Sequence, residues 1–524
     1  MGILDALVDD LPNGALAFAR QVVRERRPLR IAADVTGRIR AVNPELFAQF
    51  RKQLEPKARG QLAPWKIIDA IEAAVTLPKE EAFKREREYF IECRDSPQRR
   101  ALVHVFFAER EARKIPGLPP DIQPLPIKRA AVIGAGTMGG GIAMNFANAG
   151  IPVAVLEVSQ EALDRGVGVI RKNYGASVTR GSLTQERADQ ALALIRPVTE
   201  YEALKDADII IEAVFEDMDT KRSVFGKLDK VAKPEAILAT NTSTLDIDRI
   251  GSATGRPEQV VGTHFFSPAN IMKLLENVRG KQTSPKTIAT VMALGKTLGK
   301  IAVLAGNCDG FIGNRMVAFY GSEAEFLLEE GATPEQIDRV IEGFGFAMGP
   351  LAMRDLAGND VGFAVRKGRK LPADERWSPI LERLVAQGRY GQKTGKGFYR
   401  YEGRTRISDP EVLSLIEGVS RDLGIKRRVI ADEEILDRLL HPLVNEGARI
   451  VEEGIALRAS DVDIVYVYGY GFPAWRGGPM YWAEQAGLMR VVATMQRLAP
   501  THGERWRPAP LLERLAASGR GWSS

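Results

Sequence analysis

The sequence predicts a doubly wound α/β domain with helical regions on both sides of it along the chain. Three observations predict this architecture. A glycine-rich turn at residues 134–139 joins a short apolar segment to a helical one. Short apolar segments then alternate with helical periodicity, which indicates a parallel sheet covered by helices on both faces. From about residue 307 helical periodicity takes over, and part of that pattern occurs twice.

Length and composition limit the class of protein. A chain of 524 residues corresponds to about three or four domains. With 45% hydrophobic and 27% charged residues it is not a wholly disordered chain. Its two cysteines, Cys93 and Cys308, exclude a disulfide framework and a cysteine-based zinc site, and we predict no metal site. The small net charge of +6 favours an anionic small molecule over nucleic acid as ligand.

We find neither the pattern of a transmembrane helix nor that of a signal peptide or a peroxisomal SKL signal in the sequence. No apolar run reaches the ~18 residues that a transmembrane helix needs. The first residues, MGILDALVDD, lack the basic-then-apolar pattern of a signal peptide, and the last four, GWSS, differ from the peroxisomal SKL signal. We therefore expect a cytoplasmic protein without membrane insertion.

Changes in pattern predict five segments. Residues 1–115 have helical spacing, and the proline-rich segment 116–126 predicts a linker. The sheet domain is expected over 127–306, and the helical part is divided into 307–405 and 406–524. Within the sheet domain we expect a helix at 137–149 and strands at 130–133, 152–156, 208–214, 236–239 and 260–264.

The helical part contains an internal repeat. The sequence Glu-Glu-Gly at 329–331 recurs at 452–454, Gly-Phe-Gly-Phe at 343–346 recurs as Gly-Tyr-Gly-Phe at 469–472, and Gly-Pro at 349–350 recurs at 478–479. The offset grows from 123 to 126 to 129 residues, as small loop insertions would produce. Two tandem copies of one helical module explain this pattern, and two are too few for a solenoid.

The glycine-rich turn predicts a Rossmann NAD-binding domain. Gly134 permits the tight turn, Gly136 lets backbone N–H groups approach a pyrophosphate, and Gly139 allows close helix–strand packing. Thr137 and Met138 lie between them and belong to the same expected site. Glu157, 23 residues after the first glycine, ends the second strand, where a carboxylate accepts the ribose hydroxyls of NAD and repels the extra phosphate of NADP.

His264 differs from the other three histidines in its place on the chain. It ends an apolar strand beyond the dinucleotide site, and ligands of open α/β sheets bind outside the carboxyl ends of the strands. Oxidising an alcohol requires a base for the hydroxyl proton, and an imidazole, with an unperturbed pKa of about 6.5, suits that step. A carboxylate partner would orient the ring, although the spacing alone does not identify that partner.

Seven motifs resemble those of L-3-hydroxyacyl-CoA dehydrogenases and occur in the same order between about residues 127 and 485. With the tandem repeat, the chain resembles the bifunctional enzyme of fatty-acid β-oxidation, in which an enoyl-CoA hydratase of the crotonase type precedes the dehydrogenase. The motifs are Gly134–Gly141, Glu212–Glu216, Asn241–Leu245, His264–Pro268, Met272–Glu276, Gly310–Arg315 and Gly391–Tyr399.

The resemblance implies catalytic roles at matching positions. It makes His264 the general base and Glu276 its carboxylate partner. Ser243 would hydrogen-bond the substrate oxygen, and Asn314 would hold the thioester and the geometry of the base. The implied reaction is the NAD-dependent oxidation of an L-3-hydroxyacyl-CoA to the 3-ketoacyl-CoA.

The same resemblance implies ligand contacts outside the acid–base pair. Glu216, Lys221 and Lys393 match positions that contact NAD, and Ser243 is expected among the cofactor contacts as well. Ser267 stands where monofunctional relatives usually have Asn, and its hydroxyl can still contact the nicotinamide. Arg180 lies near the position where the family presents a cation to the CoA nucleotide.

The resemblance also bears on the two ends of the chain. Residues 2–8, 88–96 and 104–110 look like the tail of the crotonase part, so we expect a truncated form without hydratase activity. In the second helical copy Asp437 stands where the first has Asn314, so we expect the second copy to be structural and to replace the partner subunit of dimeric relatives. The expected state is a monomer. The aromatic residues Phe265 and Phe266 and the run 466–475 are expected in the core.

Two rival interpretations remain. A β-hydroxyacid dehydrogenase of the 3-hydroxyisobutyrate type also has a Rossmann domain followed by helices, but it uses a catalytic lysine and explains neither the His264 and Glu276 motifs nor the repeat. A non-catalytic scaffold that binds CoA esters would retain NAD binding without turnover. All four expected catalytic positions are intact, which favours the enzyme.

Overall fold

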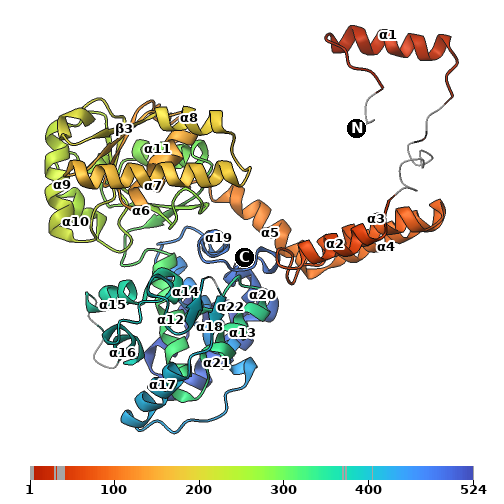
Figure 1. Ribbon diagram of the computed structural model, residues 1–524. Coiled ribbons are helices and arrows are strands. Elements are labelled where there is room, and N and C mark those ends of the chain that lie inside the picture. Colours follow the sequence, from red (N-terminus) through yellow and green to blue (C-terminus); the bar gives the residue numbers. More distant parts are fainter. Residues whose placement is uncertain are drawn as a thin grey trace. The chain divides into compact units, whose positions relative to one another are not determined.

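The computed structural model of the chain describes residues 5–28, 31, 42–368, 371, 375–403 and 405–522 (Figure 1). It contains two compact units, residues 1–96 and residues 97–524. No helix in the described ranges is long and apolar enough to cross a membrane.

The first unit is helical, as its periodicity predicts. Its helices are α1 (Leu11–Arg24), α2 (Glu45–Leu54), α3 (Ala63–Thr76) and α4 (Lys79–Asp95). Helix α3 packs against α2 and α4, and Lys66 on α3 forms an ion pair of 2.8 Å with Glu92 on α4. Part of the crotonase-like motif, residues 2–4, lies outside the described residues.

An eight-stranded sheet organises the first half of the second unit. Its spatial order is β3-β2-β1-β4-β5-β6-β7-β8. The predicted strands are present as β1 (Ala130–Ile133), β2 (Val153–Leu156), β4 (Ile209–Glu212), β5 (Ile237–Thr240) and β6 (Val260–Phe265). Alternate residues of these strands enter different apolar clusters, because helices cover both faces of the sheet.

The five predicted strands pair in parallel, as expected, and the structure adds two strands, β7 and β8, that the sequence did not predict. Strand β7 (Leu274–Arg279) runs antiparallel to β6, and β8 (Ile301–Gly306) runs parallel to β7. Only residues 266–273 separate β6 from β7, whereas a parallel crossover needs a dozen residues or more. The sequence reasoning also missed β3 (Ile195–Val198), which lies at the edge of the sheet.

Six helices accompany the sheet, and side-chain caps fix where several of them begin. Helix α6 follows the glycine-rich turn, and the side chains of Ser159, Thr184, Asp217 and Ser284 each accept a backbone N–H at the start of a helix. The helices are α6 (Thr137–Asn148), α7 (Gln160–Thr179), α8 (Gln185–Ala193), α9 (Met218–Val231), α10 (Ile247–Gly251) and α11 (Pro285–Thr297).

Helices dominate the chain after β8. The first helical region consists of α12 (Gly313–Glu330), α13 (Pro334–Phe344), α14 (Pro350–Ala357), α15 (Asn359–Lys367) and α16 (Ile380–Ala386). The second helical region consists of α18 (Asp432–Glu452), α19 (Ala459–Gly469), α20 (Pro479–Ala486), α21 (Leu488–His502) and α22 (Pro510–Ser518). Between them, α17 (Pro410–Asp422) follows a short antiparallel pair that the sequence reasoning missed, β9 (Arg400–Glu402) and β10 (Thr405–Ile407).

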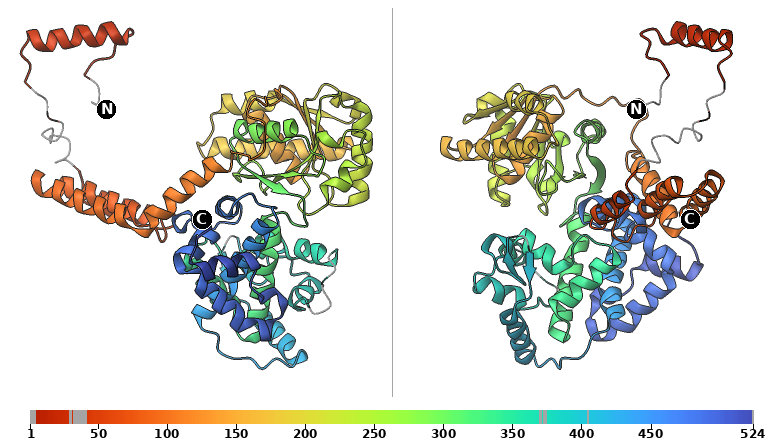
Figure 2. Two further views of the ribbon diagram at one scale, coloured as in Figure 1. Left: turned by 180° about the vertical axis from the view of Figure 1, so that it is seen from behind. Right: turned by 45° about the vertical axis from the view of Figure 1, so that its right-hand side comes forward.

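The two helical regions pack on each other through their long helices. Helix α12 lies against α18 (Figure 2). Helix α5 (Pro97–Glu111), which precedes the proline-rich segment, packs on α19 and α20, where His104 Nε2 lies 2.8 Å from the Asp463 carboxylate. Helix α5 therefore belongs to the second unit together with the sheet and the later helices.

Candidate active site

Strand pairing brings His264 and Glu276 together. The two residues lie directly opposite each other on antiparallel strands β6 and β7, so their side chains lie on the same face of the sheet. His264 Nδ1 is 2.8 Å from Glu276 Oε2. The histidine is 6% exposed and the glutamate 0%, so the pair is shielded from water at the carboxyl end of β6.

The start of helix α12 holds the second oxygen of Glu276. The backbone N–H groups of Ile312 and Gly313 donate to Glu276 Oε1 at 3.2 and 3.1 Å. The N-terminal end of a helix carries unpaired donors and partial positive charge, so it favours a carboxylate. Both oxygens of this buried group therefore have partners, one on the sheet and the other on the first helical region.

Aromatic rings border the histidine. The ring of Phe266 lies 4.3 Å from the His264 ring, measured between centroids, and that of Phe311 lies 6.0 Å away. Phe265 is buried in the core, as expected. Phe266 is also buried in the core, as expected, and its ring in addition lies beside that of His264.

Ser243 lies in a loop after β5 and contacts Glu216, whose side chain is 37% exposed. Its backbone N–H and its hydroxyl donate to Glu216 Oε1 at 2.8 and 3.1 Å, and the Thr242 hydroxyl donates to the same oxygen at 2.7 Å. Burial opposes ionisation of Glu216, but the Lys221 charge and these hydrogen bonds outweigh it and lower the pKa of the carboxyl. An anionic Glu216 thus anchors the Ser243 loop.

Lys221 joins two acids beneath this loop. Its buried ammonium lies 2.7 Å from Glu212 Oε1 and 3.2 Å from Glu216 Oε2. Thr240 on β5 donates to the other oxygen of Glu212 at 2.7 Å. The sequence reasoning named Lys221 and Glu216 as cofactor contacts but gave no role to Thr242 or to Glu212, whose charge lies inside an otherwise apolar strand and was the available signal.

Asn314 lies one residue into helix α12 and connects the sheet domain with the second helical region. Its side-chain Nδ2 donates to the Ser243 carbonyl at 3.3 Å. Its Oδ1 accepts from the hydroxyl of Tyr470 at 2.7 Å. Tyr470 follows helix α19 and was expected to be a core aromatic, so its place beside Asn314 is a finding of the structure.

The glycine-rich turn has the form that a bound dinucleotide requires. Gly134 has a φ of 97°, and a Cβ there would lie 2.7 Å from the Ala213 carbonyl oxygen. A Cβ on Gly139 would lie 1.9 Å from the Gly134 carbonyl oxygen, so glycine is needed for close packing. A Cβ on Gly136 would meet nothing within 4 Å, which leaves open space beside the start of α6 for a ligand.

Glu157 lies where the sequence predicts it, directly after β2. Its Oε1 accepts the backbone N–H of Ala135 in the glycine-rich turn at 2.8 Å. The carboxylate is therefore adjacent to the turn, as the ribose-binding position of an NAD site requires.

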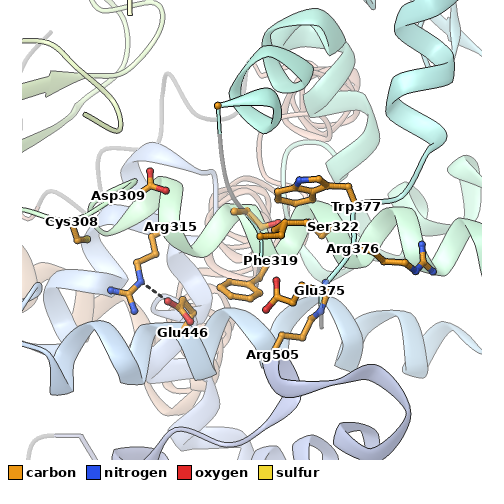
Figure 3. Close-up of a pocket in the computed structure, with 13 residues that line it drawn as sticks. Cys308, Asp309, Arg315, Phe319, Ser322, Glu375, Arg376, Trp377, Glu446 and Arg505 are labelled. Atoms are coloured by element: carbon orange, nitrogen blue, oxygen red, sulfur yellow. Dashed lines mark hydrogen bonds and ion pairs between the residues drawn. The ribbon is translucent and has the colours of Figure 1, made fainter. Parts of the chain in front are cut away.

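A largely apolar cavity opens beside the polar residues. Its volume is about 380 Å³, and Ser243, Asn314 and Tyr470 line it together with apolar side chains of α12, α14, α15 and α16. The volume is in the range of small-molecule sites. A second cavity, of about 500 Å³ and with many charged residues, shares Ala318, Ser322 and Trp377 with the first (Figure 3).

Three predicted ligand contacts lie apart from these hydrogen-bonded groups. Lys393 is in a short 3-10 helix (Gln392–Thr394) after α16, where its ammonium pairs with Asp360 at 2.6 Å. Arg180 follows helix α7, is exposed, and donates to the Ala176 carbonyl at 3.1 Å. Ser267 is exposed after β6.

Comparison with known proteins identifies the family. Residues 129–308 match the family described as 3-hydroxyacyl-CoA dehydrogenase, NAD binding domain, and residues 310–401 and 435–521 match the corresponding C-terminal domain. The chain belongs to the 3-hydroxyacyl-CoA dehydrogenase family. It is therefore an NAD-dependent oxidoreductase, as the sequence predicts.

Relatives of this dehydrogenase extend the match along the whole chain. The peroxisomal bifunctional enzyme of Cavia porcellus is 40% identical over 99% of this chain and 74% of its own length. The enzyme of the same name from Danio rerio is 43% identical over 99% of this chain and 75% of its own length. The dehydrogenase part of multifunctional enzyme 1 from C. elegans has a TM-score of 0.59 and 31% identity, over 79% of this chain and 96% of that one.

The prediction of a cytoplasmic location is wrong. The similar bifunctional enzymes are named peroxisomal, which conflicts with it. Composition carries no information on this point, because compartment addresses are short segments read by receptors and leave no trace in the fold or the overall charge.

Proposed function

We propose that His264 is the general base of this 3-hydroxyacyl-CoA dehydrogenase and that Glu276 is its positioning partner. The reaction is the NAD-dependent oxidation of a 3-hydroxyacyl-CoA to the 3-ketoacyl-CoA. The observation that carries the proposal is the buried 2.8 Å contact between His264 Nδ1 and Glu276 Oε2. A carboxylate can only accept at this contact, so the imidazole Nδ1 carries the hydrogen and Nε2 is left to take the substrate proton.

Glu276 also stabilises the charge that this step creates. When His264 takes the hydroxyl proton it becomes an imidazolium, whose charge the buried carboxylate offsets. The nicotinamide supplies the hydride acceptor when NAD is bound. In the reverse direction the imidazolium returns its proton to the substrate oxygen.

Ser243 and Asn314 orient the substrate in this proposal. The Ser243 hydroxyl donates to the substrate oxygen in place of, or in exchange with, its bond to Glu216. The Asn314 amide holds the thioester and the geometry of the base. Both residues line the 380 Å³ cavity, whose apolar walls suit the acyl part of the substrate and support this arrangement.

The glycine-rich turn and Glu157 supply the dinucleotide site in this proposal. Gly134, Gly136 and Gly139, with Thr137 and Met138, would hold the pyrophosphate at the start of α6, and Glu157 would accept the ribose hydroxyls. The open space beside Gly136 supports this assignment. Glu216 and Lys221 would lie along the nicotinamide half, together with Ser243, Ser267 and Lys393. Arg180 would face the CoA nucleotide.

We also propose that the helical part is a tandem repeat. Helices α12, α13 and α14 correspond in order and spacing to α18, α19 and α20, and one C-terminal family description matches both stretches. The proposed boundaries remain 127–306, 307–405 and 406–524, after a crotonase-like tail at 1–115 and a linker at 116–126. Because α12 and α18 pack within one chain, we propose a monomer.

The test is the loss of NADH with acetoacetyl-CoA as substrate. Wild type, His264→Ala and His502→Ala are compared, the last as a histidine outside the site. Removing a general base is expected to lower kcat by about 10²–10⁴-fold, while NADH binding persists and His502→Ala remains active. Equal turnover by His264→Ala and wild type would overturn the assignment. NADH binding without turnover in every protein would favour a scaffold.

A further inference from the structure

Tyr470 fixes the orientation of the Asn314 side chain. An asparagine amide presents an acceptor on one side and two donors on the other. The Tyr470 hydroxyl donates to Asn314 Oδ1 at 2.7 Å, which directs the amide nitrogen to the Ser243 carbonyl at 3.3 Å. Both side chains line the cavity that contains Ser243.

The chain makes room for the tyrosine at this point. A Cβ on Gly313 would lie 2.3 Å from Tyr470 Cε2 and 2.6 Å from its hydroxyl oxygen, so only glycine allows the ring over the start of α12. The ring also packs edge-to-face on Phe266 at 5.6 Å, and Phe266 in turn contacts the ring of His264. Tyr470 is thus packed between Asn314 and the neighbour of the proposed base.

The internal repeat shows that the fold does not require this hydroxyl. The segment Gly469-Tyr470-Gly471-Phe472 corresponds to Gly343-Phe344-Gly345-Phe346 in the first helical region. Phe344 has no hydroxyl and packs edge-to-face on Phe472 and Trp482. The hydroxyl is therefore a feature that distinguishes the second helical region at this position, where it reaches Asn314.

Arg315, the residue after Asn314, also attaches the start of α12 to the second helical region. Arg315 Nε lies 2.5 Å from Glu446 on α18 (Figure 3). The same guanidinium lies 2.5 Å from Glu453, which directly follows that helix. These ion pairs keep Asn314 close to Tyr470. Burial raises the pKa of the Tyr470 hydroxyl well above its usual value, so the group remains a donor.

We infer that Tyr470 is a positioning residue for Asn314, and that the second helical region thereby contributes to the active site. The inference rests on the proposed role of Asn314. In this arrangement Tyr470 binds no substrate. It holds the amide in the orientation in which its nitrogen faces the Ser243 loop and the cavity.

A double-mutant cycle tests the inference. Tyr470→Phe, Asn314→Ala and the double variant are compared with wild type in the full chain, with kcat and KM measured for acetoacetyl-CoA and NADH at enzyme concentrations that resolve slow turnover. Tyr470→Phe is expected to lower kcat by about tenfold, because one positioned hydrogen bond is lost, and to leave the KM for NADH unchanged. In the Asn314→Ala background the same change is expected to have no further effect.

Tyr466→Phe is the matched control. The Tyr466 ring stacks on Tyr470 at 4.9 Å, but its buried hydroxyl has no hydrogen-bond partner among the described residues. This variant is expected to turn over as wild type does. A kcat of Tyr470→Phe within twofold of wild type would overturn the inference, as would a tenfold loss that persists in the Asn314→Ala background. If the proposed base is wrong instead, His264→Ala retains turnover whatever the result of this cycle.

Discussion

The first and second helical regions begin one of their short helices in the same way, but they contact different neighbours. Asp338 accepts the backbone N–H groups of Leu351 and Ala352 at the start of α14, and Asp463 accepts that of Met480 at the start of α20. The glycine before each helix is needed for this contact, because a Cβ on Gly349 or Gly478 would lie within 2.4 Å of the aspartate.

The remaining contacts of these aspartates differ. The Tyr399 hydroxyl, in the segment between α16 and β9, donates to Asp338 at 2.8 Å. Asp463 instead contacts the imidazole of His104 on helix α5. The two aspartates thus cap their helices in the same way but have different further contacts. Asp338 contacts the segment that follows α16, and Asp463 contacts helix α5, which precedes the proline-rich linker.

The two regions also differ at the position that faces the sheet. Asn314 lies at the start of α12 beside Glu276 and Ser243, whereas its counterpart Asp437 on α18 pairs with Arg490 at 3.0 Å. If the two regions are the copies that we propose, one fold was kept while its chemistry was divided. In the proposed mechanism the first region contacts the His264–Glu276 pair, and the second supports the site through Tyr470.

The largest expected difference between the two regions is the loss of turnover when Asn314 is replaced. Asn314→Ala removes a positioned donor, and losses of that kind lower the rate by about 10²–10³-fold. Asp437→Ala changes the matching position of the second region and is expected to leave turnover within twofold. Steady-state kinetics with acetoacetyl-CoA measure both variants, and equal losses would mean that the two regions do not differ as proposed.

A smaller expected effect concerns the aspartates that cap α14 and α20, and it is a pH dependence of stability. Burial raises the pKa of Asp338 to about 6, from 3.8, although its hydrogen bonds act in the opposite direction. The folded state therefore holds this proton more tightly than the unfolded state, so its contribution to stability is present below pH 4 and lost as the pH rises to 6. A shift of this size corresponds to about 3 kcal/mol.

Asp338→Asn is expected to remove that part of the pH dependence, because an amide does not titrate. Urea unfolding at pH 4 and pH 7 measures it, and Asp463→Asn is expected to act in the same direction, since burial also raises the pKa of Asp463 to about 6. Asp422, whose side chain is 61% exposed, is the control. If Asp422→Asn flattens the profile as strongly as Asp338→Asn, burial is not the cause.

The sequence predicted those features of the fold that depend on residues close together along the chain. The turn from β1 to α6, the place of Glu157 after β2 and the position of His264 at the end of β6 all follow from short-range periodicity and glycine spacing. The repeat in the helical part was visible for the same reason, because matching helices keep matching turn residues.

Contacts between distant residues were beyond such reasoning. The direction of β7 depends on the short connection after β6, and the partner of His264 was named through a family resemblance. The bond between Asn314 and Tyr470 joins residues 156 positions apart, so nothing in either local pattern indicates it. The sequence signal for this contact was that the repeat has Tyr470 where its first occurrence has Phe344. The aromatic ring was instead interpreted as that of a core residue.

In the proposed mechanism Glu276 makes His264 an effective general base, and the variant Glu276→Gln tests this role most directly. The amide can still accept the N–H groups of Ile312 and Gly313, but it cannot offset the imidazolium charge. In a single turnover with NADH and acetoacetyl-CoA, we expect hydride transfer to slow by about 10²–10⁴-fold with NADH binding and thermal stability retained. A rate within threefold of wild type would contradict the account.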